Sequence, residues 1–104
     1  MADVAEKSRT RLALEQMARN GRYRIPDHMW GAVERYVEHR IPPGNFLSAV
    51  VSNDLREAAS RADDDNQRAL ADYMAFFTSY APMGCWGSPE AYHDWINPKE
   101  TADG

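Results

Sequence analysis

The residues that could carry out catalysis are few in this chain. The only cysteine, Cys85, could act as a thiolate nucleophile if a histidine accepted its proton, and the candidates are His28, His39 and His93. None of these residues lies in a sequence string typical of thiol enzymes, and the chain has neither a Gly-rich phosphate loop nor a Gly-x-Ser-x-Gly turn. We therefore expect Cys85 to be a small buried residue and expect no catalytic site.

The same residue types do not predict a metal site. A structural zinc site needs four ligands at close spacing, which one cysteine and three scattered histidines do not provide. The acidic run that begins at Asp63 lacks the glycine of a calcium loop, and its twelfth position is Met74 instead of glutamate. We expect no metal and no cofactor. The run should form a solvated turn that caps the next helix, and its acidic residues are Asp63, Asp64 and Asp65.

Two adjacent polar residues, Asn53 and Asp54, interrupt a segment whose apolar spacing predicts one helix over residues 45–62, with Leu55 on its buried side. Asparagine and aspartate disfavour helix interiors because their side chains compete for backbone hydrogen bonds. Either the two side chains satisfy a neighbouring loop or an arginine, or they line a site for a ligand or partner.

Aromatic residues near the C-terminus form a second candidate surface. Trp86 lies in a loop with a glycine on each side of the pair Cys85-Trp86, and Tyr92 and Trp95 follow on a short predicted helix. Either this loop folds back and closes one end of the domain, or Trp86 and Tyr92 are anchors for a partner.

Charge is unevenly distributed along the chain. Residues 1–24 carry six basic and three acidic side chains, and the other residues carry six basic and 13 acidic ones, so the net charge of −4 divides into +3 and −7. The basic segment is either a solvated helix or a contact arm for nucleic acid or an acidic neighbour, and self-association through opposite charges is a further alternative. Its arginines are Arg9, Arg11, Arg19, Arg22 and Arg24.

The periodicity of apolar residues predicts an all-α fold, a compact bundle of four to five helices. The expected helices cover residues 3–20, about 26–41, 45–62, 65–80 and 89–96. The helix at 65–80 is apolar over most of its circumference and should be central. We expect a basic N-terminal helix at 1–22, a helical core domain at 23–97 and a flexible tail at 98–104.

The chain has no apolar run of the ~20 residues that a membrane span requires and no apolar stretch of a secretory signal at its start. A single cysteine cannot form an internal disulfide. These features favour a cytoplasmic protein that does not contact a membrane.

Several short strings stand out between Ile41 and Trp95. They are Ile-Pro-Pro-Gly-x-Phe-Leu-x-Ala-Val from Ile41, Asn-Asp-Leu from Asn53, Arg-Ala-Asp from Arg61 and Cys-Trp-Gly-Ser-Pro-Glu from Cys85, followed by Trp95. Together they resemble a group of short bacteriophage and prophage proteins of unknown function. The resemblance covers roughly residues 23–96 and leaves out the N-terminal helix. It implies a phage-encoded accessory protein in a bacterial host, without an assigned activity.

Three functions remain open at this point. The first is a non-enzymatic phage-type protein that binds and modulates or inhibits a host macromolecular component, such as a bacterial defence (CRISPR-like) complex. Its acidic body could enter a basic nucleic-acid channel as a duplex would. The second is a small nucleic-acid-binding protein that uses the basic N-terminal helix. The third is a domain that binds or sequesters a small ligand, with Asn53 and Asp54 lining a pocket between helices. The protein could also be a homo-oligomer.

Overall fold

The computed structural model describes residues 7–98, in which the chain forms seven α-helices, one 3₁₀ turn and no strand. The predicted all-α class is confirmed, and the predicted count of four to five helices is too low. None of the helices in this part of the chain has the length and apolar character that crossing a membrane requires. The elements are α1 (Arg9–Asn20), η1 (Asp27–Met29), α2 (Trp30–His39), α3 (Asn45–Val51), α4 (Leu55–Arg61), α5 (Asp64–Arg68), α6 (Leu70–Ser79) and α7 (Pro89–Ile96).

The expected helix at 45–62 is wrong, because the chain forms two helices there, α3 and α4, that meet at Asn53 and Asp54. Asn53 has a left-handed φ of 61°, which no helix interior contains. Asp54 is the N-terminal cap of α4, since its carboxylate accepts a hydrogen bond of 3.1 Å from the backbone N–H of Glu57. The two residues that disfavour a helix interior therefore end one helix and cap the next.

The expected helix at 65–80 is also divided, into α5 and α6 at Ala69, whose φ of −100° and ψ of 10° depart from helical values. Asp63 is the residue of the acidic turn that caps α5, by accepting a 2.8 Å hydrogen bond from the backbone N–H of Asn66. The α7 helix has the predicted bounds, with Ser88 as its cap and Pro89 in its first turn.

The first helix is shorter than expected. It begins at Arg9 with Ser8 as its cap and ends before Gly21, which has a left-handed φ of 84°. Residues 1–6 of the expected helix and arm, and residues 99–104 of the expected tail, lie outside the described residues.

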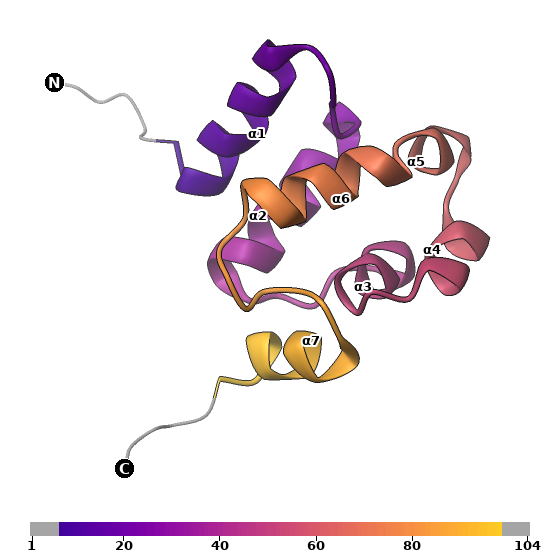
Figure 1. Ribbon diagram of the computed structural model, residues 1–104. Coiled ribbons are helices and arrows are strands. Elements are labelled where there is room, and N and C mark those ends of the chain that lie inside the picture. The colour runs from indigo at the N-terminus through magenta and orange to yellow at the C-terminus, as the bar shows by residue number, and fades with distance from the viewer. Residues whose placement is uncertain (1–6, 99–104) are drawn as a thin grey trace, which may run out of the picture.

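The α6 helix crosses the middle of the molecule, with α1 on one side and α3 on the other (Figure 1). The α6 side chains of Tyr73, Phe76 and Phe77 are at most 2% exposed, which confirms the expected central position of this segment. Leu14 and Met17 of α1 belong to the same core. The described part of the predicted arm is therefore docked on the rest of the protein, with its charged side chains still at the surface.

The loop between α6 and α7 folds back onto α2 and α3. The backbone N–H of Gly87 donates a 2.8 Å hydrogen bond to the carbonyl of Val51 at the end of α3. The indole N–H of Trp95 donates a 2.9 Å hydrogen bond to the carbonyl of Tyr36 in α2. These contacts hold α7 against the end of the bundle.

Candidate functional site: an apolar pocket beside Leu55

An open pocket of about 210 Å³ lies between the α3–α4 junction and α6. We call it the Leu55 pocket, after the residue at its edge whose side chain is 66% exposed. Its lining is mostly apolar, with two polar residues at the junction. The lining residues are Val50, Asn53, Asp54, Leu55, Ala58, Leu70, Ala71 and Met74.

The pocket depends on the break between α3 and α4. Val50, near the end of α3, and Ala58, on α4, are each 2% exposed and form its buried side. On the α6 side, Leu70 and Met74 are one turn apart and therefore share a face of the helix. Ala58 and Ala71 are small, so the space between the helices is not filled by their side chains.

Leu55 was expected on the buried side of a continuous helix, and this expectation is wrong. Because α4 is a separate helix that begins after Asp54, the apolar stripe of α3 does not continue in register along α4. Leu55 is the first residue of α4 and lies mostly in solvent. The sequence feature that could have indicated the exposure of Leu55 is the preceding pair Asn53 and Asp54, because both residues disfavour a helix interior.

Asn53 and Asp54 have a structural role and also line the pocket. Asn53 provides the left-handed residue between the two helices, and Asp54 provides the cap of α4. The backbone N–H of Asp54 donates a 2.9 Å hydrogen bond to the carbonyl of Ala49, which fixes the junction. Within residues 7–98 the carboxylate of Asp54 pairs with neither an arginine nor the loop around Trp86. Both polar residues are therefore positioned by local backbone geometry.

The structure does not bring Trp86 and Tyr92 to this pocket. The Trp86 ring packs on Phe77, with ring centroids 6.0 Å apart. The hydroxyls of Tyr92 and Ser48 are 3.1 Å apart, within hydrogen-bond distance, and the Tyr92 ring lies 6.0 Å from that of Tyr36. Both aromatic residues are half-buried and contribute to packing, and neither lines the Leu55 pocket.

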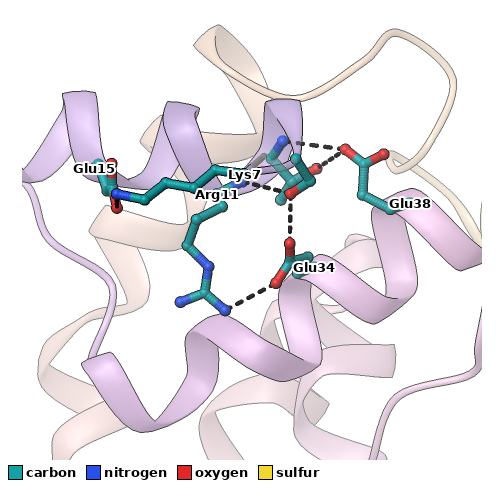
Figure 2. Close-up of polar contacts among 7 residues, drawn as sticks. Lys7, Arg11, Glu15, Glu34 and Glu38 are labelled. Carbon is teal, nitrogen blue, oxygen red and sulfur yellow. Dashed lines mark hydrogen bonds and ion pairs between the residues drawn. The ribbon is translucent and has the colours of Figure 1, made fainter. Parts of the chain in front are cut away.

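The basic residues of α1 are partly engaged with α2. Arg11 forms a 2.8 Å ion pair with Glu34, and Lys7 forms a 2.7 Å ion pair with Glu15 along the helix (Figure 2). The Ser8 hydroxyl also donates a 2.5 Å hydrogen bond to Glu34. This bond and the Arg11 guanidinium hold the pKa of Glu34 below its usual value. The contacts of Ser8 and Arg11 with Glu34 attach α1 to α2.

The other arginines of the predicted arm do not form an ion pair with α2 as Arg11 does. Arg24 forms a 2.6 Å ion pair with Asp27, and its guanidinium lies 5.3 Å from the centre of the Trp30 ring. The Arg22 guanidinium lies 5.3 Å from the centre of the Tyr23 ring. Among the described residues, Arg9, Arg19 and Arg22 have no ion-pair partner. The interpretation of this surface as a nucleic-acid contact arm stays a prediction.

The groups considered for catalysis or metal binding lie apart from the pocket. Cys85 is fully buried, and burial raises the pKa of its thiol to about 11. His28 lies 3.8 Å from Asp63, with both side chains more than half exposed. Among residues 7–98, no group of three or more His, Cys, Asp or Glu side chains is arranged to hold a metal ion.

No protein-family model, no curated protein and no solved structure matches the chain. Its own geometry defines the class of this protein: over residues 7–98 it is an all-α domain with an open apolar pocket at a helix junction. Such a pocket binds by removing apolar surface from water, with the polar groups at its edge setting orientation.

Proposed function

We propose that this chain is a small phage-type interaction protein that binds a host macromolecule and modulates or inhibits it. The Leu55 pocket is the observation that carries this proposal, because it exposes a hollow apolar surface with Leu55 at its edge. Burying apolar surface is favourable by about 25 cal/mol per Å². A partner that places an anchor side chain in the pocket would gain this energy at the centre of its interface.

The size of the pocket favours a side chain over a free small molecule. Small-molecule sites usually measure about 300–1,000 Å³, and the Leu55 pocket measures about 210 Å³. Met74 at its wall is unbranched and can change rotamer to fit the side chain that enters. We infer that the partner supplies one aliphatic or aromatic anchor.

The surface around the pocket is acidic. Between residues 54 and 72 the chain carries six acidic and three basic side chains. The ion pairs Glu57–Arg61 and Asp65–Arg68 in this region are exposed, so they contribute little to stability and leave the net negative charge in place. A partner segment with basic residues beside its apolar anchor fits this surface best.

The phage context comes from the sequence resemblance, and it suggests where such a partner is found. A host complex that holds nucleic acid in a basic channel would attract the acidic body, whose net charge over residues 25–104 is −7. A bacterial defence complex is one example. In this proposal the protein acts in the cytoplasm of the host.

We assign no catalytic step to the protein. Cys85, the strongest nucleophile in the chain, is fully buried, and its thiol stays neutral at physiological pH because burial raises its pKa to about 11. The function proposed here needs only complementary shape and charge.

Affinity purification from a bacterial host tests the role of the pocket. Tagged wild-type protein should retain a partner that Leu55→Glu and Ala71→Trp lose at least tenfold, because the first change places a charge at the pocket and the second fills it. Leu12→Glu is the matched control, since Leu12 is 51% exposed on α1 and outside the pocket. Circular dichroism should show the same helix content in all four proteins.

Two results would count against the proposal. Equal recovery of the same partners by the wild type and both pocket variants would show that the pocket is not the interface. Partner binding that does not weaken as salt rises would remove the contribution of the acidic surface.

A further inference from the structure

A second cleft, larger than the Leu55 pocket, has a different chemistry. It measures about 420 Å³ and lies between the start of α1, the end of α2, the end of α6 and α7. Its volume falls within the usual range for sites that hold small molecules. Two arginines, Arg9 and Arg40, line it together with Val37, Glu38, Tyr80 and Trp95.

Arg40 is held in place by its backbone and by Trp95. Its φ of 59° is left-handed, which is uncommon for a residue other than glycine. Its guanidinium lies 3.8 Å from the centre of the Trp95 ring and donates a 3.1 Å hydrogen bond to the Trp95 carbonyl. A guanidinium that stacks on an aromatic ring keeps its other in-plane N–H groups for an anion, and its geometry is fixed before the anion binds.

The charge in the cleft is positive although the whole chain is acidic. Arg9 is the first residue of α1 and forms no ion pair within residues 7–98. Glu38 is the acidic residue of the lining, and one of its oxygens accepts hydrogen bonds of 3.1 and 2.6 Å from the backbone N–H and the hydroxyl of Thr10 (Figure 2). The lining therefore carries two arginines and one carboxylate, which is already bound to Thr10.

We infer that this cleft binds a small organic oxyanion, a carboxylate or phosphate group carried on a flat apolar body. Arg9 and Arg40 would hold the oxyanion through charge-assisted hydrogen bonds. Val37, Tyr80 and Trp95 offer apolar and aromatic surface for the rest of the ligand. This site is separate from the Leu55 pocket and does not depend on the function proposed for it.

Titration of the full chain, followed by amide and indole NMR shifts, tests the cleft with three probes. Benzoate and inorganic phosphate carry the oxyanion, and benzamide is a neutral analogue of benzoate. We expect benzoate or phosphate to shift the Trp95 indole signal and benzamide to leave it unchanged. Tighter binding of benzoate would identify a carboxylate ligand, and tighter binding of phosphate would identify a phosphate-bearing one.

Two substitutions make the test specific. Arg9→Gln should weaken binding of the preferred anion at least tenfold, and Arg68→Gln should not, because Arg68 is an exposed arginine on α5 outside the cleft. Arg40→Lys keeps the charge but loses the planar stack on Trp95, so it should also weaken binding. The inference fails if neither anion shifts Trp95, if benzamide binds as well as benzoate, or if Arg9→Gln binds like the wild type.

Discussion

The Tyr36 hydroxyl donates a 2.6 Å hydrogen bond to the carbonyl oxygen of Cys85, and this bond joins the middle of α2 to the loop before α7. Both residues are fully buried. Burial raises the pKa of the Tyr36 phenol above its usual value, so the group stays a neutral donor. The carbonyl of Tyr36 in turn accepts the hydrogen bond from Trp95. Tyr36 is therefore the residue on which the loop and α7 are anchored.

Replacement of Tyr36 by phenylalanine should destabilise the protein by about 1–3 kcal/mol, because the buried Cys85 carbonyl loses its donor. Denaturation by urea, followed by circular dichroism, measures the change. Tyr23→Phe is the control, since Tyr23 is half-buried and its hydroxyl forms no hydrogen bond within residues 7–98. The control should stay within about 0.5 kcal/mol of the wild type. Equal stability of the two variants would show that the Tyr36 bond contributes nothing.

The left-handed φ of Asn53 at the α3–α4 junction predicts that alanine and glycine at this position differ in stability. Asn53→Ala should cost about 1 kcal/mol, because alanine lacks the short polar side chain that lets asparagine adopt this left-handed φ. Asn53→Gly should be more stable than the alanine variant by a similar amount, since glycine adopts positive φ freely. Thermal unfolding gives the order of the two, and Ser52→Ala, at a φ of −80°, is the neighbouring control. The reverse order would mean that Asn53 is not held left-handed in solution.

The contacts of Glu34 predict a dependence of stability on pH. The Ser8 hydrogen bond and then Arg11 hold the pKa of Glu34 below its usual value of 4.5 in the folded chain. This contribution is present above pH 4.5 and is lost as the pH falls through the folded pKa. The free energy of unfolding should therefore fall less steeply below pH 4.5 in Glu34→Gln than in the wild type. Parallel curves for the two proteins would contradict the linkage.

The burial of Cys85 predicts that its thiol is unreactive in the folded protein. At pH 8 the thiol is neutral and enclosed, because burial raises its pKa to about 11. Iodoacetamide should label the native chain far more slowly than the chain in urea, as measured by mass spectrometry. Tyr36→Phe should speed up labelling, because it loosens the loop. Equal rates in native and denatured protein would place Cys85 in an open site.

The basic helix provides a separate test of nucleic-acid binding. If this alternative function is correct, the wild type should be retained on DNA or RNA at low salt, and the double change Arg19→Glu and Arg22→Glu should abolish retention. Neither residue has an ion-pair partner among the described residues, so the fold should be unaffected. Arg56→Glu on α4 is the control for charge alone. A wild type that is not retained at low salt excludes this function.

Local side-chain chemistry was enough to predict several features of the fold. The Ser88 cap and Pro89 correctly predicted where α7 begins, because both act on the backbone within one turn of the helix. Gly21 correctly predicted where α1 ends, because its left-handed conformation also acts locally. Aromatic residues on all sides of the segment at 65–80 indicated its central position, since large apolar surfaces must leave water.

The break at Asn53 and the Leu55 pocket could not be predicted in the same way. The apolar spacing from Phe46 to Ala62 fits a continuous helix, and asparagine and aspartate allow either a helix interior or a turn. In the structure the pair forms a turn, with the Asp54 N–H bonded to the Ala49 carbonyl and the Asp54 carboxylate capping α4, and Leu55 lies mostly in solvent. The sequence by itself determined the helical class, much of the core and the presence of the polar pair at the junction. Only the tertiary structure placed this pair beside Leu70 and Met74, because the distance between helices depends on contacts far apart along the chain.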